Sequence, residues 1–325
     1  MQPAESPAIA SGKTLVVVTG PTASGKTALA VELARELGAE VISADSRQLY
    51  RDLPIGTAAP TAAEMQGVPH HLVGTLNLNE PYSAARFETD VLELLPRLWQ
   101  RSDYAVMCGG SMMYVDAVTR GIDCLPDISA EVRAQVLDTY HSEGLDYMLS
   151  WLDEVDPVYC AEVDRSNPRR VLHALEICLE AHVPYSTLRT GRVKPRPWRT
   201  VTVAPQWSRD DLFARINARV ERMVADGLVD EARALFDRRH LNSLNTVGYK
   251  ELFAAFRGEL DLPTAIARIG KNTRVYAKKQ LTWMKKRPEI HLLDPYSDTP
   301  MARQALDIIA EATAANAPSA NALSE

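Results

Sequence analysis

The 325-residue chain lacks the features of secreted and membrane proteins. It has four cysteines and no C-x-x-C pair, so we expect reduced packing thiols rather than a disulfide framework. No apolar run approaches the roughly 18 residues that a membrane-spanning helix needs. Residues 1–13 contain no apolar segment of the kind found in a secretory signal. We therefore expect a cytoplasmic protein that does not contact a membrane.

The chain also has no excess of positive charge. Its net charge is −6, which argues against a generally basic, nucleic-acid-binding surface. The cations are unevenly distributed, however. Arg268–Arg287 holds eight Lys or Arg and no acid, and Arg165–Arg199 holds eight against Glu176 and Glu180. Such local basic stripes can contact a phosphate backbone. A solvated helix face explains the same pattern, and the sequence leaves both readings open.

A phosphate-binding motif stands near the N-terminus, where the apolar run Leu15–Val18 leads into G-x-x-x-x-G-K-T and then a helical pattern. Backbone N–H groups and the helix N-terminus of such a loop point at one spot, so they bind an anion. We expect Lys26 to contact the terminal phosphates and the Thr27 hydroxyl to ligate Mg²⁺. The predicted diphosphate-binding loop is Gly20, Pro21, Thr22, Ala23, Ser24, Gly25, Lys26 and Thr27.

The alternation of short apolar runs with amphipathic stretches predicts an α/β fold: a P-loop core with a parallel sheet flanked by helices, plus a helical insertion domain. Expected strands are Leu15–Thr19, Val41–Ala44, Tyr104–Cys108, Thr200–Ala204 and Ile290–Leu293. Expected helices are Lys26–Leu37, Ser83–Trp99, Met112–Thr119, Ala130–His141, Tyr147–Glu154, Arg169–Ala181, Leu212–Asp226, Val229–Asp237, Tyr249–Arg257 and Leu262–Met284.

The domain plan follows from changes in pattern along the chain. Strand-like runs stop near Leu125-Pro126 and return at Thr200, which brackets a wholly helical block. The tail is rich in Ala, Asn and Ser without periodicity, so we expect it to be flexible. The predicted segments are a flexible terminus at 1–13, the first part of the core at 14–124, the helical insertion at 125–199, core completion with basic helices at 200–311, and a flexible tail at 312–325.

A second chemical group is expected at Asp45, which directly follows the strand Val41–Ala44. The carboxyl ends of parallel strands meet at one edge of a sheet, so this carboxylate should lie near the phosphate-binding loop. It can act as a general base or a metal ligand, and a helix N-cap is the structural alternative. The nearby Gln48 suggests reading of a purine, since a Gln amide can pair with an adenine edge.

These motifs resemble, in order and spacing, those of the tRNA dimethylallyltransferase family, and the similarity spans residues 14 to about 294. The residues that carry it are Gly20–Thr27, Asp45–Gln48, Gly56–Ala58, Gly109–Ser111, Thr246–Lys250 and Tyr276–Trp283. The resemblance implies an enzyme that moves a dimethylallyl group from its diphosphate to the exocyclic amine of an adenosine adjacent to the anticodon.

The resemblance also implies roles for individual residues. Asp45 matches the general base, Thr22 a hydroxyl near the reacting centre, and Arg219 a cation on the diphosphate; for Arg215, diphosphate binding and an exposed helix position stay open. Positions that match tRNA contacts are Asp45, Ser46, Arg47, Gln48, Ser111, Arg133, Arg169, Arg170, His173, Asn245, Thr246, Val247, Gly248, Tyr249 and Lys250.

This sequence departs from the family pattern at His173, where bacterial relatives carry a third basic residue. A neutral imidazole is a weaker phosphate partner than a guanidinium, which puts that contact in doubt. No cysteine follows Cys178, so the zinc finger of eukaryotic relatives is missing. The expected partners are an anticodon stem-loop of tRNA, dimethylallyl diphosphate and Mg²⁺, bound by a monomer of the bacterial type.

Two other functions use a phosphate-binding loop. A small-molecule kinase of the nucleoside-monophosphate type shares the loop, the size and a helical lid, but leaves Asp45–Gln48 and the basic C-terminal helix unexplained. It also predicts an acid near residues 108–110, where Gly109-Gly110 stands. A GTPase-like switch is disfavoured because the sequence has no Asn-Lys-x-Asp run.

Overall fold

The computed structural model describes residues 12–314, which form two compact units. One unit takes in the chain up to Thr119 and again from Arg196 onward, and the other is Arg120–Pro195. The flexible ends expected at 1–13 and 312–325 lie mostly outside the described residues. Among residues 12–314 no helix is long and apolar enough to cross a membrane.

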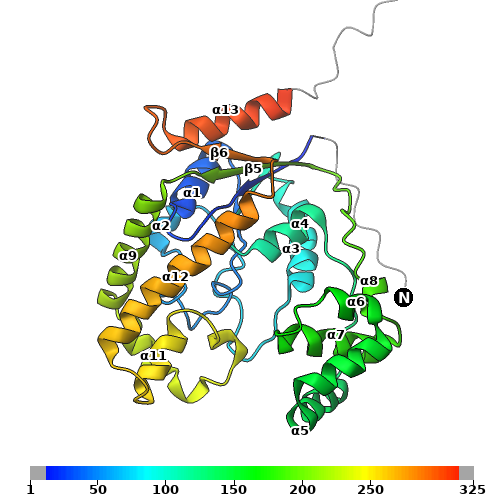
Figure 1. Ribbon diagram of the computed structural model, residues 1–325. Coiled ribbons are helices and arrows are strands. Elements are labelled where there is room, and N and C mark those ends of the chain that lie inside the picture. Colours follow the sequence, from blue (N-terminus) through cyan, green and yellow to red (C-terminus); the bar gives the residue numbers. More distant parts are fainter. Residues whose placement is uncertain (1–11, 315–325) are drawn as a thin grey trace, which may run out of the picture. The chain divides into compact units, whose positions relative to one another are not determined.

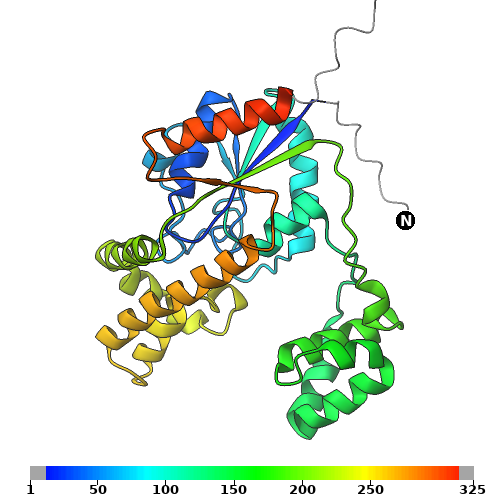
Figure 2. The same cartoon turned by 45° about the horizontal axis from the view of Figure 1, so that its top comes forward.

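The first unit is built on a parallel sheet of six strands in the order β3-β2-β4-β1-β5-β6. The strand that leads into the phosphate-binding motif is β1, which pairs with β4 on one side and β5 on the other (Figure 1). Seen from above, the strands splay as a twisted sheet does (Figure 2). The strands are β1 (Thr14–Val18), β2 (Val41–Ser43), β3 (His70–His71), β4 (Tyr104–Cys108), β5 (Arg199–Pro205) and β6 (Ile290–Leu293).

Helices cover both faces of this sheet, which explains why β1 reads as an unbroken apolar run rather than an alternating one. Val16 and Val18 pack in one core with helices α1 (Lys26–Glu36) and α13 (Met301–Ala314). Leu15 and Val17 pack in the other, with residues of α3 (Ala84–Leu98), α4 (Met112–Arg120) and the helices that follow β5. β1 is therefore buried on both sides, and the loop after it starts from a rigid base.

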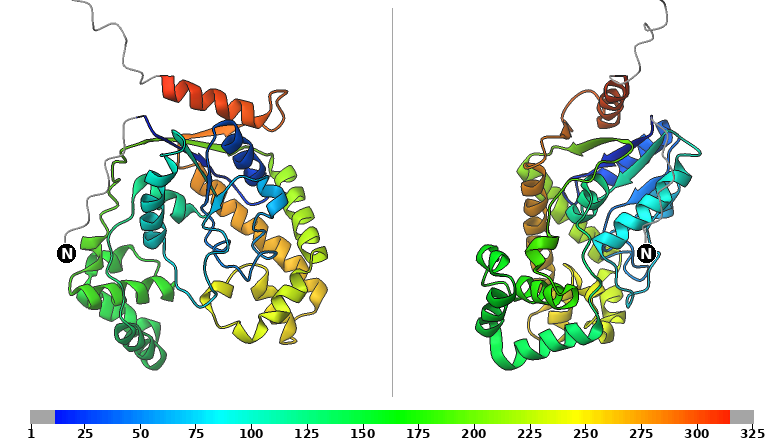
Figure 3. Two further views of the ribbon diagram at one scale, coloured as in Figure 1. Left: turned by 180° about the vertical axis from the view of Figure 1, so that it is seen from behind. Right: turned by 90° about the vertical axis from the view of Figure 1, so that its right-hand side faces the viewer.

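Two long helices run beside one another across this unit. α9 (Arg209–Ala225) contacts α12 (Leu262–Met284), as the front and rear views show (Figures 1 and 3). α12 has the predicted bounds, and it starts at Asp261, whose carboxylate accepts the Thr264 N–H. In the sequence, α9 and α12 are separated by α10 (Leu228–Ala234), the 3-10 turns Phe236–Arg238 and Asn242–Leu244, and α11 (Tyr249–Phe256).

Local signals set the helix ends largely as expected. The Ser83 hydroxyl caps α3 by accepting the Arg86 N–H, and Gly38 follows α1 with φ +59°. Pro96 lies inside α3 without ending it. The one-turn helix α2 (Ala62–Met65) carries a capping box between Thr61 and Glu64 that was not predicted.

The second unit is all helical and has a core of its own. Its longest helical segment, α5 (Ala130–Val155), is interrupted at Gly144, where φ is +79°. The sequence predicted one helix on each side of this residue, and the interruption confirms that division. The buried Asp156 caps the next helix and also binds both the N–H and the hydroxyl of Ser186. The helices are α5 (Ala130–Val155), α6 (Pro157–Glu162), α7 (Pro168–Ala181) and α8 (Tyr185–Leu188).

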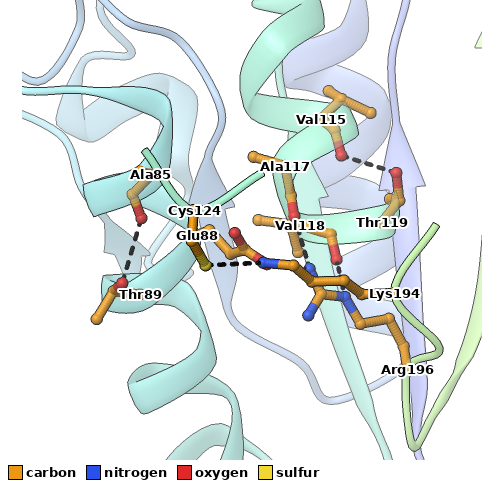
Figure 4. A network of polar contacts seen from close by, with 10 residues as sticks. All are labelled: Ala85, Glu88, Thr89, Val115, Ala117, Val118, Thr119, Cys124, Lys194 and Arg196. Atoms are coloured by element: carbon orange, nitrogen blue, oxygen red, sulfur yellow. Dashed lines mark hydrogen bonds and ion pairs between the residues drawn. The ribbon is translucent and has the colours of Figure 1, made fainter. Parts of the chain in front are cut away.

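The insertion bounds differ from the expected 125–199, because Arg120–Pro195 forms the second unit. Arg196 belongs to the first unit for a clear reason. Its guanidinium donates to the carbonyls of Ala117 and Val118 at the end of α4 and pairs with the buried Glu88 of α3 (Figure 4). The chain therefore re-enters the core at a fixed point, next to where it left.

Candidate active site

A cavity of about 400 Å³ opens at the carboxyl ends of the central strands of the first unit. The turn after β1 delivers Thr22, the start of α1 delivers Lys26 and Thr27, and the turn after β2 delivers Asp45. Gly109–Ser111 arrives from the end of β4, between the two. This arrangement places the cavity where α/β sheets generally bind ligands.

The cavity brings together most of the predicted site residues. Those that line it are Thr22, Lys26, Thr27, Asp45, Ser46, Arg47, Gln48, Ser111, Arg219, Asn245, Thr246, Val247 and Lys250.

The phosphate-binding loop has its expected form, with Gly25 in the left-handed region at φ +91° just before α1. The Lys26 ammonium donates to the Pro21 carbonyl at 2.6 Å, so the side chain folds back over its own loop. Ser24 is buried and its hydroxyl has no partner among residues 12–314. Gly20, Pro21, Ala23, Ser24 and Gly25 contribute backbone to the loop rather than side chains to the cavity wall.

Cations outnumber acids on the cavity wall: Lys26, Arg47, Arg219 and Lys250 face a single carboxylate, Asp45. Burial, together with the charge of Arg219, lowers the pKa of Lys26 to about 8. Burial also lowers the pKa of Arg219, against the charge of Asp45. Within the described chain the Arg219 guanidinium has no hydrogen bond or ion pair. Such crowded, unneutralised cations favour an anionic ligand.

Asp45 is oriented through one of its two carboxylate oxygens. Oδ1 accepts the N–H groups of Arg47 at 2.9 Å and Gln48 at 3.3 Å. Oδ2 has no hydrogen-bond donor in the described part of the chain. The neighbouring Ser46 is held by Ser111, whose hydroxyl accepts the Ser46 N–H. One oxygen thus fixes the carboxylate and the other stays available for a proton or a metal ion.

Gln48 lines the cavity, but its amide is already engaged. Its Oε1 accepts from the Ser43 hydroxyl, and its Nε2 donates to the carbonyls of Thr57 and Ala58. The prediction that this amide pairs with an adenine edge is therefore not supported by its placement. Arg47 likewise donates to the carbonyls of Asn242 and Ser243, which ties the Asp45 turn to the segment before α11.

Arg215 does not line the cavity and its helix position is exposed, so diphosphate binding by this residue stays a prediction. Its Nε donates to the Ala23 carbonyl from outside the loop, and its guanidinium stacks on Trp207. The Trp207 indole in turn donates to the Ser24 carbonyl. Arg215 and Trp207 therefore both hold backbone carbonyls of the loop.

The glycines after β4 explain why no acid stands there. A Cβ on Gly109 would lie 2.1 Å from the Ala44 carbonyl oxygen. On Gly110 it would lie 2.3 Å from Nε2 of Gln280. Only glycine allows the turn to pass this close to the end of β2 and to α12. The turn therefore gives shape to the site rather than a metal ligand.

Apolar side chains form another part of the wall. Arg219, Val220 and Met223 follow Ile216 by three, four and seven residues, so all four lie on one face of α9. Ile269 of α12 and Val247 complete this patch. The cavity wall thus combines cations with hydrocarbon side chains.

Tyr249 is fully buried, so its side chain is not available to a tRNA. Its hydroxyl binds Glu231, whose carboxylate also accepts the N–H groups of Ile55 and Gly56. Gly248, with φ +100°, starts α11 and donates its N–H to Glu251. These two positions of the predicted tRNA-binding run have structural roles, whereas the others line the cavity.

The remaining predicted tRNA contacts lie in the second unit. Arg169, Arg170 and His173 are exposed on the first turns of α7, which carry no acid. Cations at a helix N-terminus are electrostatically unfavourable without an anion nearby. Arg133 and His173 share Glu176, at 3.9 and 3.7 Å. The His173 ring therefore has a carboxylate partner within its own unit.

The basic helix α12 is only partly a free cationic face. Lys271, Lys278 and Lys285 are exposed, as predicted, but Arg274 donates to Asn217 of α9. Arg287 is held by Asp116. Val275 on the same helix is exposed as well.

The wall fits a magnesium ion that arrives with its ligand. In residues 12–314 no group of three or more His, Cys, Asp or Glu could hold a metal by itself. Mg²⁺ usually binds through one or two protein oxygens plus phosphate oxygens and water. The Thr27 hydroxyl and Asp45 Oδ2 lie on the cavity wall and supply such oxygens.

Sequence reasoning missed Gln280 and Tyr276, which reach the cavity from α12. Both stand in the segment Tyr276–Trp283 quoted for its resemblance, and Gln280 is the only uncharged amide in that run. A polar residue buried on a helix face was the available signal, because the helix period places it beside Ala277 and Met284.

Comparisons with known proteins give the family of this chain. The sequence profile described as IPP transferase matches residues 48–287. tRNA dimethylallyltransferase 2 of Parabacteroides distasonis is 51% identical over 281 residues, which are 86% of this chain and 94% of that protein. tRNA dimethylallyltransferase 1 of Bacteroides thetaiotaomicron is 48% identical over 286 residues, covering 88% and 93%.

Solved structures show the same likeness. The tRNA isopentenylpyrophosphate transferase of Bacillus halodurans superposes with a TM-score of 0.68 at 36% identity, covering 93% of this chain and 97% of that one. A eukaryotic dimethylallyltransferase solved acting on tRNA gives a TM-score of 0.80 at 25% identity, over 94% and 80% of the two chains. This chain belongs to the IPP transferase family, the family of the tRNA dimethylallyltransferases.

Proposed function

We propose that this enzyme transfers the dimethylallyl group of dimethylallyl diphosphate to the N6 amine of the adenosine on the 3′ side of the anticodon in tRNA, and releases diphosphate. The observation that carries this proposal is the cavity wall, which combines cations with hydrocarbon side chains. A diphosphate suits Lys26 and Arg219, and a five-carbon hydrocarbon suits Ile216, Val220 and Met223. A kinase is not favoured, since it leaves the hydrocarbon side chains of the wall without a ligand group.

The residues divide the chemistry among them. The adenine nitrogen attacks the allylic carbon, the carbon–oxygen bond to the diphosphate breaks, and the amine proton passes to Asp45 through its free Oδ2. Arg219 and Lys26 offset the charge that grows on the leaving diphosphate. Thr22 places its hydroxyl on the same wall. A bound Mg²⁺, held by Thr27, would neutralise further charge on the leaving group.

The tRNA substrate needs positive surface outside the cavity and a base turned out of its stack. Arg169 and Arg170 on α7 and the lysines of α12 supply exposed cations. Lys250 and Asn245 supply polar groups on the cavity wall. Because one chain provides the whole wall, we propose that the enzyme acts as a monomer, in the cytoplasm where tRNA is available.

Donor choice tests the proposal. The protein is incubated with Mg²⁺, bulk tRNA and either dimethylallyl diphosphate or ATP, and the tRNA is digested to nucleosides for mass spectrometry. We expect consumption of the prenyl donor and one prenylated adenosine species, with no consumption of ATP. Consumption of ATP alone would establish the kinase instead.

A further inference from the structure

Gln280 is a buried amide that joins two turns of the active site. It lies near the end of α12 with 3% of its surface exposed. Its Oε1 accepts the Thr22 N–H at 3.0 Å, and its Nε2 donates to the Gly110 carbonyl at 2.8 Å. We propose that Gln280 is a positioning residue that holds Thr22 of the phosphate-binding loop in its reactive orientation. The proposal rests on the proposed prenyl transfer.

The two hydrogen bonds require an amide at this position. The Thr22 N–H needs an acceptor and the Gly110 carbonyl needs a donor, so the orientation of the Gln280 amide is fixed by its neighbours. A carboxylate could accept from Thr22 but would face the Gly110 carbonyl without a proton to donate. An apolar side chain would leave the Thr22 N–H without its acceptor and the Gly110 carbonyl with only the Tyr276 hydroxyl, at 3.4 Å. Gly110 is matched to this amide, because a Cβ there would collide with it.

The contact with Gln280 fixes the backbone position of Thr22. Its own N–H points at Gln280 instead of at a phosphate, while its side chain lines the cavity. The next residue, Ala23, has φ +64°, and its carbonyl is held by Arg215. The backbone at Thr22 is therefore fixed on both sides. Because a β-branched side chain has few rotamers, fixing this backbone fixes the hydroxyl as well.

The rest of the donor-binding wall does not depend on Gln280. Lys26, Thr27 and Arg219 reach the cavity from α1 and α9. Loss of Gln280 should therefore lower kcat far more than it weakens diphosphate binding. A role in general folding would lower neither quantity selectively.

A double-mutant cycle tests the link between Gln280 and Thr22. The full-length variants are Thr22→Ala, Gln280→Met and the pair together, with Gln100→Met on an exposed glutamine as the matched control. Single-turnover rates with saturating tRNA and affinities for inorganic diphosphate are measured for each. We expect Gln280→Met to slow transfer by about 10–100-fold, as a small misplacement of a reacting group does, with diphosphate affinity nearly unchanged.

The pair should be no slower than Thr22→Ala alone, because Gln280 acts only through Thr22. Independent effects that multiply, or an unchanged rate in Gln280→Met, would overturn the proposal. If Gln280→Met does not fold, Gln280→Glu is used, because repulsion between its carboxylate and the Gly110 carbonyl displaces the acceptor from Thr22; the same non-additivity is expected. A wild type that does not prenylate tRNA would refute the proposed function, whereas an additive cycle in an active enzyme refutes only the role of Gln280.

Discussion

At Asp45 one carboxylate oxygen is occupied by two backbone N–H groups and the other is not. Asp45→Asn keeps an acceptor for those N–H groups but cannot take a proton. We expect single-turnover prenyl transfer to fall by roughly 10²–10⁴-fold, the usual effect of losing a general base. Affinities for diphosphate and tRNA should stay close to wild type. Asp52→Asn, on an exposed carboxylate nearby, is the control, and equal rates in the two variants would contradict the role of Asp45.

Lys26 gives donor binding a pH dependence. Burial lowers its pKa to about 8, so the free enzyme loses this charge as the pH rises through about 8. A diphosphate prefers the charged amine, and binding above that pH must therefore take up a proton. We expect the Lys26 contribution to diphosphate affinity to be nearly constant well below pH 8, to begin falling as the pH approaches 8, and to fall above it by at most tenfold per pH unit. Calorimetry in buffers of different ionisation enthalpy measures both the affinity and the proton.

Lys26→Arg serves as the matched variant, because a guanidinium does not titrate in this range. Its affinity curve should lack the fall above pH 8, while the ionisation of the ligand itself is common to both proteins. Parallel curves for the two proteins would show that Lys26 is not the titrating group.

Residues whose role depends on local sequence could be predicted, and those whose role depends on distant contacts could not. The loop Gly20–Thr27 and Asp45 were readable because a strand end and a motif define them. Gln280 was not, since its partner Thr22 is 258 positions away. The contact of Arg215 with the Ala23 carbonyl and the burial of Tyr249 against Glu231 and Gly56 likewise depend on residues elsewhere in the sequence.

Among the elements, α12 is predicted to bind tRNA through its exposed lysines. Lys278 and Lys285 are exposed on a helix that also reaches the cavity through Gln280. Replacing both lysines with Gln should weaken tRNA binding and flatten its salt dependence by up to about one unit of slope per lost phosphate contact. Diphosphate affinity should not change. Binding is measured by filter retention or anisotropy at several salt concentrations.

The control removes two exposed cations from the helices on the other face of the sheet, Arg35→Gln in α1 and Arg303→Gln in α13. It leaves the net charge equal to that of the lysine variant. If both double variants lose the same affinity and slope, only overall charge matters, and α12 is not a tRNA-binding element.

Element bounds were predictable wherever the period was uninterrupted. The expected Leu262–Met284, Tyr104–Cys108 and Ile290–Leu293 have the observed ends, because caps and apolar periodicity act over a few residues. Helix α13 was missed, although its buried residues Ala302, Ala305 and Ile309 recur at the three- and four-residue spacing of an amphipathic helix. The two-residue strand β3 carries no signal that a sequence pattern could detect.

On the scale of the whole molecule, the insertion is separable from the donor site. Every residue that lines the cavity belongs to the first unit, and the second has its own core. The two points at which the insertion interrupts the first unit are adjacent, because Arg196 donates to the Val118 carbonyl (Figure 4). Replacing Arg120–Pro195 with a short Gly/Ser linker should preserve diphosphate affinity and reduce tRNA affinity strongly. Circular dichroism checks that the shortened chain folds, and a folded chain that no longer binds diphosphate would contradict this separation.

The order of strands in the sheet has a consequence for synthesis on the ribosome. β1 carries the phosphate-binding loop, yet one of its two neighbours, β5, follows the insertion. At about 5–20 residues per second, roughly 4–15 s pass while the insertion is made and one edge of β1 stays unpaired. An open, apolar edge strand is a template for wrong pairing. An insertion that folds by itself during that interval keeps its own apolar residues away from the waiting edge, so slow decoding within this segment should favour correct assembly, and slow decoding after Arg196 should favour aggregation.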